Sequence, residues 1–381
     1  MMQILAVDIG TGTQDVFLLR SGLSLENGFK LVLPSPTMIV RQRLLEAAER
    51  RQDVLLTGVT MGGGPSQWGV EAVRRVGARV FATPPAARTF NDDLEEVQHA
   101  LGVEIVSEDE AAGLKGVERI VLGDFDFAAL EQAFGLFGVV LRPAAVAVAV
   151  FDHGAAPPGV SDRQFRFDYL EARLRAESRL SAFAYRAHEI PGFLTRMQAV
   201  AISAGQLDCP LVVMDTAPAA ILGAGFDPHV GRCARRAMVN VGNFHALGFR
   251  LGPEGIEGLF EHHTGLLDRE RLESLIDRLA AGTLTREEVF QDQGHGALVL
   301  CPTPLPLDGP DFGVVVTGPR RGLLAGSRLR PYFAVPFGDM MLSGCFGLLA
   351  AMADLVPEVA WPVREALLTG KPTAAPWEDA G

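Results

Sequence analysis

The first 19 residues constrain the fold more than any other stretch of the chain. Residues 4–7 are apolar and lead directly into Asp8; a turn of glycine and threonine follows, and a second apolar run begins at Val16. This order is typical of a strand, a tight hairpin turn and a second strand. Gly10 and Gly12 lack a Cβ, so the backbone of the turn can approach a ligand closely. The alternative is an ordinary hairpin with a turn that happens to be rich in these residues.

The same turn offers groups that bind an anion. We expect the backbone N–H groups and the two hydroxyls of Gly10, Thr11, Gly12 and Thr13 to surround a phosphate. A carboxylate beside a polyphosphate requires a divalent cation between them. The sequence therefore predicts that Asp8 holds Mg²⁺ through water.

A similar pattern returns in the second half of the chain. Asn240 takes the place of Asp8, and Gly242 takes that of Gly10, 232 positions later (240 minus 8). Two similar hairpins so far apart indicate a duplicated architecture.

Length and composition limit the class of protein. The 381 residues are long for one core, so we expect two domains, residues 1–208 and 209–381. With 48% hydrophobic and 21% charged residues, the chain is typical of a soluble globular protein. Its net charge of -12 argues against a nucleic acid as partner, because binding to phosphates of nucleic acid relies on a basic surface.

The sequence predicts neither secretion nor a membrane anchor. No basic region precedes an apolar stretch at the N-terminus, and the most apolar segment, residues 340–352, is too short to span a bilayer and is predicted to be a buried helix. The cysteines have no short spacing, which argues against a metal cluster and a disulfide framework. They are Cys209, Cys233, Cys301 and Cys345. We expect a cytoplasmic protein with reduced thiols and no membrane partner.

Strand-like and helix-like segments alternate along the first half. Strands are expected at residues 29–33, 54–58, 79–82, 120–123, 145–151 and 211–215, and helices at 38–51, 68–76, 128–134 and 197–205. This βαβ alternation predicts an α/β fold.

Three features of the first half are open to more than one interpretation. Residues 62–64, all glycine, form either a flexible turn or a loop that closes over a ligand. Asp152 follows an apolar strand and is either a local cap or a catalytic group at the ligand-binding edge of the sheet. Residues 161–187 interleave arginines with acids, a pattern typical of a solvated helix face.

In order and approximate spacing, these parts resemble the sugar kinase, actin and Hsp70 superfamily of two-domain ATPases. The resemblance rests on DIGTGT at 8–13, NVGN at 240–243, the small-residue helix around 218–220, VVVTGP at 314–319 and the segment 336–351. It implies two RNase H-like α/β domains that face a central nucleotide cleft, with ATP and Mg²⁺ as cofactors. It further implies that Asn240, Gly242 and Asn243 form the second phosphate motif and that Thr317 and Gly318 contact the adenosine.

More narrowly, the chain resembles a prokaryotic family that carries the label of pyruvate formate-lyase activating enzyme. The shared motifs are DIGTGTQD at 8–15, NVGNFH at 240–245, EHHTG at 261–265 and GHG at 294–296. The label finds no support in these residues, because a radical activating enzyme needs clustered cysteine thiolates for an iron–sulfur centre. The chain also departs from the superfamily at Asn240, where an acid is usual, and an amide cannot act as a general base.

Five histidines lie in or beside these motifs: His153, His245, His262, His263 and His295. With nearby carboxylates they suit a transition metal, but they equally suit binding of an anionic substrate, proton transfer or hydrogen bonds to the backbone. We assign His262, His263 and His295 to the substrate. The transition metal stays open, because no helical His-x-x-x-His pair exists.

The sequence therefore predicts an ATP- and Mg²⁺-binding phosphotransferase or ATPase. Asp8, Asp15, Asp152 and His245 are its catalytic candidates. The sequence does not define the acceptor, a small molecule or a protein, and it allows a homo-oligomer. One alternative is a nucleotide-sensing partner protein with little turnover, which Asn240 favours; another is a metal-dependent hydrolase that uses the histidines.

Overall fold

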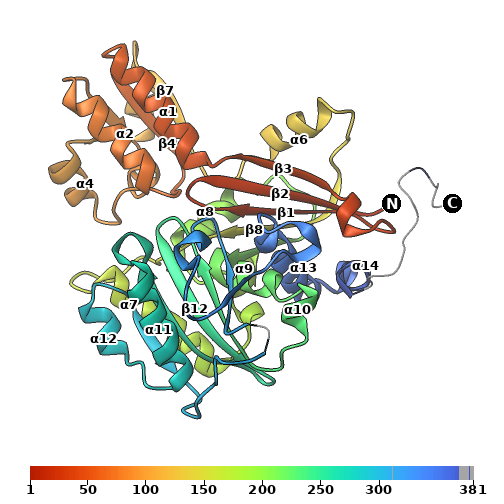
Figure 1. Cartoon of the computed structure of the whole chain (residues 1–381). Coiled ribbons are helices and arrows are strands. Elements are labelled where there is room, and N and C mark those ends of the chain that lie inside the picture. The colour runs from red at the N-terminus through yellow and green to blue at the C-terminus, as the bar shows by residue number, and fades with distance from the viewer. Residues whose placement is uncertain (311, 369–376, 378–381) are drawn as a thin grey trace.

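The computed structural model describes residues 1–310, 312–368 and 377 (Figure 1). Two six-stranded sheets, one from each half of the chain, form its framework. Their strand orders are β3-β2-β1-β8-β10-β9 and β14-β13-β12-β11-β15-β16. We call the first sheet with its attached helices and insertion the first lobe, and the second sheet with its helices the second lobe.

The first sheet begins with the predicted hairpin. Its strands are β1 (Gln3–Ile9), β2 (Thr13–Arg20), β3 (Phe29–Pro34), β8 (Pro143–Val150), β9 (Ala184–Arg186) and β10 (Leu211–Asp215). β1, β2 and β3 are antiparallel neighbours, and β8 and β10 follow as parallel strands on the other side of β1. The apolar run of β8 is buried because helices cover the sheet on both faces.

The second sheet repeats this plan. Its strands are β11 (Arg236–Val241), β12 (His245–Gly252), β13 (Gly255–His263), β14 (Gly296–Val299), β15 (Val314–Thr317) and β16 (Pro331–Phe333). β13, β12 and β11 are antiparallel, and β15 and β16 are parallel to β11. The five strands β13-β12-β11-β15-β16 thus match β3-β2-β1-β8-β10 in order and direction. The predicted fold class, an α/β protein with two RNase H-like domains, is confirmed.

A small parallel sheet is inserted in the first lobe between β3 and β8. Its strands are β4 (Val54–Gly58), β5 (Val80–Ala82), β6 (Glu104–Ile105) and β7 (Glu118–Leu122), in the order β6-β5-β4-β7. The insertion also holds α1 (Pro36–Glu49), α2 (Gly64–Arg75), α3 (Pro84–Ala87), α4 (Leu94–Leu101), α5 (Glu108–Gly113) and α6 (Phe127–Gly135). Most of this unit projects from the two large sheets (Figure 1). The predicted alternation was right, but it builds a separate sheet.

The remaining helices cover the two large sheets and fill the space between them. They are α7 (Asp162–Ala176), α8 (Thr195–Ser203), α9 (Thr216–Ala224), α10 (Pro228–Gly231), α11 (Arg269–Ala281), α12 (Arg286–Gln291), α13 (Ser343–Leu355) and α14 (Pro357–Leu368). α13 is the apolar segment predicted to be a buried helix, and it packs against the first sheet. Among the described residues, no helix is long and apolar enough to cross a membrane.

The order of the strands bears on where the two lobes divide. β10 lies beyond residue 208 in the chain, yet it pairs with β8 in the first sheet. α13, close to the C-terminus, also packs on that sheet. The division at residues 208 and 209 stays a prediction, while the first lobe includes these two later segments.

α9 and α13 contact each other through glycine. A Cβ at Gly223 would clash with the carbonyl oxygen of Ser343, and one at Gly347 would clash with that of Ala219. The small-residue composition of α9 therefore allows the backbones of the two helices to approach closely.

This contact predicts an effect on stability. Gly347→Ala should lower the free energy of unfolding by about 1–3 kcal/mol, because the added methyl group forces the helices apart. Gly135→Ala is the matched control, since Gly135 also lies in a helix and its Cβ would meet no atom within 4 Å. The control should be neutral or more stable by up to about 1 kcal/mol, because alanine favours the helix. Urea denaturation of both variants measures this, and equal stabilities would contradict the close contact.

Candidate functional site

A cleft of about 440 Å³ lies between the two lobes. It is lined by both hairpin turns, by the glycine loop at residues 62–64 and by the ends of β8, β10 and β15. All nine residues predicted to bind the nucleotide line it: Gly10, Thr11, Gly12, Thr13, Asn240, Gly242, Asn243, Thr317 and Gly318. The turns are close to each other, since a Cβ at Gly12 would lie 3.0 Å from Nδ2 of Asn243.

The two turns share one hydrogen-bonding geometry. The N–H of Gly10 donates to the carbonyl of Thr13, and the N–H of Gly242 donates to that of His245, each at 2.9 Å. These two N–H groups close their own turns, so they are not the phosphate donors that the sequence suggested. Among the described residues, the N–H groups next along each turn, at residues 11 and 12 and at 243 and 244, have no partner. They are the donors available to an anion in the cleft.

A pair of carboxylates lies beside the first turn. Asp8 and Asp15 are directly opposite each other on β1 and β2, and both side chains are buried. Burial, with repulsion from Asp215, raises the pKa of Asp8 to about 6, although a hydrogen bond from the Thr216 hydroxyl at 2.6 Å opposes the rise. Burial and repulsion from Asp8 raise the pKa of Asp15 to about 8.

These residues fit a magnesium ion. Oδ1 of Asp15 is buried without a hydrogen-bond partner among the described residues. Two neighbouring carboxylates with raised pKa values lack a compensating positive charge, and a hard divalent cation with oxygen ligands supplies it. With Mg²⁺ bound, both carboxylates would be ionised at neutral pH.

The second lobe closes the cleft near Asn240. Thr317 is the neighbour of Asn240 across the β11–β15 pair, and its hydroxyl is buried without a partner among the described residues. Gly318 has φ +96°, and a Cβ there would come within 2.5 Å of Oδ1 of Asn240. Glycine is therefore required at this turn, and the Thr317 hydroxyl is left free to meet a ligand.

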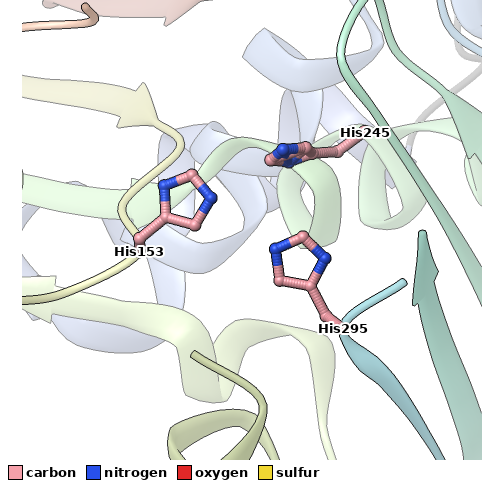
Figure 2. Close-up of side chains that lie close together, drawn as sticks. All are labelled: His153, His245 and His295. Atoms are coloured by element: carbon pink, nitrogen blue, oxygen red, sulfur yellow. The ribbon is translucent and has the colours of Figure 1, made fainter. Parts of the chain in front are cut away.

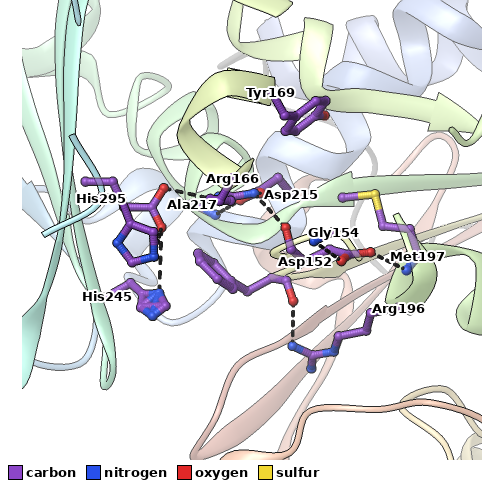
Figure 3. A network of polar contacts seen from close by, with 12 residues as sticks. Asp152, Gly154, Arg166, Tyr169, Arg196, Met197, Asp215, Ala217, His245 and His295 are labelled. Atoms are coloured by element: carbon purple, nitrogen blue, oxygen red, sulfur yellow. Dashed lines mark hydrogen bonds and ion pairs between the residues drawn. The ribbon is translucent and has the colours of Figure 1, made fainter. Parts of the chain in front are cut away.

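Asp152 lines the cleft, but its carboxylate is already engaged. It accepts hydrogen bonds from the N–H groups of Gly154 at 2.8 Å and Met197 at 2.9 Å (Figure 3). These bonds hold the start of α8 against the end of β8. The capping interpretation therefore accounts for Asp152 without a catalytic role.

Arg166 was expected on a solvated helix face, and this expectation was wrong. Its side chain is fully buried between the lobes, and its guanidinium donates to Asp215 at 2.5 Å, to Glu261 at 3.2 Å and to the carbonyl of Asp152 at 2.9 Å (Figure 3). The signal was present in the sequence. Arg166 stands four residues before Leu170 and eight before Leu174, on the apolar face of α7.

The five histidines occupy different environments. His153 and His245 line the cleft, whereas His262, His263 and His295 do not. His262 points to the other side of β13 from His263 because side chains alternate along a strand. Its ring nitrogens lie 3.2 and 3.0 Å from the carbonyl oxygens of His263 and Asp292. His262 therefore anchors a loop, and we do not carry its predicted contact with a substrate further.

The other four histidine rings cluster at the junction of the lobes. Ring centroids are 5.1 Å apart for His153 and His245, 5.0 Å for His245 and His295, and 4.8 Å for His263 and His295. Figure 2 shows three of them facing a shared space. Burial lowers the pKa of each ring, to about 3 for His153, so the rings are neutral at pH 7. Burial also raises the pKa of the adjoining Glu261 to about 7.

Comparison with known proteins gives one family. A family model described as "Putative pyruvate format-lyase activating enzyme (DUF1786)" matches residues 61–323. The curated proteins contain no match.

Solved structures are similar to this chain at a low level. The activator of the 2-hydroxyisocaproyl-CoA dehydratase from Clostridium difficile, with bound ADPNP, is 11% identical with a TM-score of 0.36, over 98% of this chain and 100% of that one. The psk41 ParM protein is 12% identical with a TM-score of 0.30, over 94% and 98%. The ROK hexokinase from Thermus thermophilus is 13% identical with a TM-score of 0.29, over 91% and 98%.

The carboxylate pair predicts a pH dependence of stability. The pKa of Asp15 is about 8 in the folded protein against 3.8 ordinarily, so the folded state binds more protons between these values. The ligand-free protein should therefore lose stability as the pH rises from about 5 to about 8. Asp15→Asn should be more stable than the wild type at about pH 8 by at least about 1.4 kcal/mol, the equivalent of one pKa unit.

Urea denaturation across this pH range, without Mg²⁺ or nucleotide, measures the effect. The exposed Asp208 provides a matched control, and Asp208→Asn should follow the wild type at each pH. Parallel stability curves for Asp15→Asn and the wild type would mean that Asp15 is ionised in the empty cleft.

Proposed function

The chain belongs to the DUF1786 family, and we propose that it binds ATP with Mg²⁺ between its two lobes and transfers the γ-phosphoryl group to an acceptor or to water. One observation carries the proposal: two equivalent turns, one from each lobe, present free N–H groups to the same cleft beside a pair of carboxylates. Because the protein has a net charge of -12, it must bind a triphosphate through local groups. Backbone N–H groups and a divalent cation are suitable groups for this.

Each group has a distinct task in this proposal. Asp8 and Asp15 would hold Mg²⁺, which neutralises charge on the phosphates. The N–H groups of residues 11, 12, 243 and 244 would hold the phosphate oxygens from both sides. Thr317 and Gly318 would contact the nucleoside. Such reactions depend mainly on positioning and on electrostatic stabilisation rather than on covalent chemistry by the protein.

The acceptor would lie on the side of the cleft that His245 lines. Because the carboxylate of Asp152 is engaged by backbone N–H groups and Asp15 would hold Mg²⁺, His245 is the remaining candidate to orient an acceptor. The acceptor's identity as a small molecule or a protein and the assembly of the chain into a homo-oligomer remain predictions, as does a cytoplasmic location.

A second candidate is a nucleotide-sensing partner protein with little turnover. Asn240 favours it, because the amide stands where a carboxylate would assist the reaction and cannot accept a proton. The family's description as an activating enzyme is compatible with a protein that acts on another enzyme. Radical activation itself is not proposed: among the described residues, no cysteine belongs to a group of three or more metal-binding side chains.

Calorimetric titration tests the nucleotide site. The wild type should bind ATP only with Mg²⁺, and Asp8→Asn should weaken binding at least about 100-fold, because it removes a charged ligand of the metal while keeping the size of the side chain. Asp208→Asn, at the surface, should bind as the wild type does. Unchanged affinity in Asp8→Asn would remove Asp8 from the proposal.

Single-turnover hydrolysis separates the enzyme from the sensor. With the protein in excess over ATP, an ATPase or kinase should release or transfer phosphate from most of the bound nucleotide, with candidate acceptors present. A sensor should bind ATP with the same affinity and leave it intact. A chain that fails to bind any nucleoside triphosphate would contradict both candidates.

A further inference from the structure

Three imidazoles surround one small space at the junction of the lobes. His153 follows β8 in the first lobe, whereas His245 begins β12 and His295 precedes β14 in the second. One ring nitrogen from each lies within 4.8 Å of the others (Figure 2). Within residues 1–310, 312–368 and 377, no other group of three or more His, Cys, Asp or Glu side chains is spaced in this way.

His153 and His245 are half-buried, and His295 is the buried member of the group. The side chain of His295 is fully buried, and neither of its ring nitrogens has a hydrogen-bond partner among the described residues. Oε1 of Glu261 is also buried without one, 3.7 Å from Nδ1 of His245 and 3.8 Å from Nε2 of His295. Buried polar atoms are nearly always hydrogen-bonded because an unsatisfied one is destabilising, so several together indicate a missing ligand.

We propose that His153, His245 and His295 bind one divalent transition metal ion, and that Zn²⁺ is the ion expected. Neutral imidazole is a preferred ligand of such ions, and three histidines with one open position form a known type of zinc site. Bonds of about 2.0–2.1 Å in a tetrahedral site bring the three nitrogens to about 3.4 Å from one another. Rotation of the side chains about χ1 and χ2 closes the difference.

Glu261 would select which nitrogen of His245 and of His295 faces the metal. Its Oε1 lies 3.7 Å from Nδ1 of His245 and 3.8 Å from Nε2 of His295, so a small shift would let it accept a proton from each. Nε2 of His245 and Nδ1 of His295 are then the metal ligands. Arg166 holds the other oxygen of Glu261, so the carboxylate is a positioning group with a fixed orientation.

The metal would connect the two lobes. His153 and His245 also line the nucleotide cleft, so the fourth coordination position faces it and is open to water or to an acceptor oxygen. This inference concerns a cation with nitrogen ligands and does not depend on the proposed Mg²⁺ and nucleotide site, where the ligands are carboxylates.

Titration of the metal-free chain, prepared without a polyhistidine tag, tests this site. Zn²⁺ is added in competition with a chromophoric chelator. The wild type should bind one Zn²⁺ per chain, and His295→Ala should lose at least about 100-fold in affinity. His188→Ala is the matched control, since His188 is exposed and stands apart from the cluster, and it should bind as the wild type does. Bound Co²⁺ should give the absorption bands of a tetrahedral site in the wild type. His295→Ala should not show these bands.

Further variants keep the test decisive. Circular dichroism checks the fold of His295→Ala; if it is unfolded, His153→Ala, in a loop outside the sheet, replaces it. Mg²⁺-dependent ATP binding should persist in a folded histidine variant, and Zn²⁺ binding should persist in Asp8→Asn, so the two proposals fail separately. Absence of stoichiometric Zn²⁺ and Co²⁺ binding in the wild type, or unchanged affinity in both histidine variants, overturns the site.

Discussion

The buried guanidinium of Arg166 is the interaction on which the arrangement of the two lobes depends. It binds Asp215, at the end of β10 and the start of α9, and Glu261 in β13 of the second sheet. A buried charge without a partner is strongly destabilising. Movement of either lobe away from α7 would leave Arg166 or one of its carboxylate partners unpaired. The same contact orients Glu261 toward the histidines. One side chain therefore couples the packing of the lobes to the geometry of the candidate metal site.

The charges in the cleft explain why a ligand is needed there. Asp8 and Asp15 face each other across a hairpin, and like charges in that position repel. Burial is the main cause of the raised pKa of both carboxyls, and repulsion from neighbouring carboxylates adds to it. In a folded protein such an arrangement is maintained at a cost in stability, and it becomes favourable once a divalent cation is bound. In the proposed function the free N–H groups beside the pair would complete a site for a metal-bound polyanion.

The repeated hairpin made the two-lobed fold predictable, because its pattern of apolar strand, polar residue and glycine turn is local in the sequence. The hairpin residues predicted to bind the nucleotide line the cleft for the same reason, whereas Thr317 and Gly318 were named from the family resemblance. The Arg166 contacts could not, since they join α7 to strands 49 and 95 residues away, and an interleaving of arginines with acids looks the same on a buried face as on a solvated one. His262 and His263 are adjacent, yet strand alternation separates their roles, and only the pairing of β12, β13 and β14 selects His295 as the partner of His245.

The ligand chemistry of the cleft divides it into two parts. Oxygen ligands on the first hairpin suit a hard cation such as Mg²⁺, and neutral nitrogen ligands at the junction of the lobes suit a transition metal. The two sets are on different elements and share no residue. A nucleotide at the carboxylate pair and an acceptor oxygen at the histidine cluster would lie in the same cleft. In the proposed function the duplicated hairpins would position the phosphates. The histidine cluster, which has no equivalent in the first hairpin, would distinguish this site from a simple nucleotide pocket.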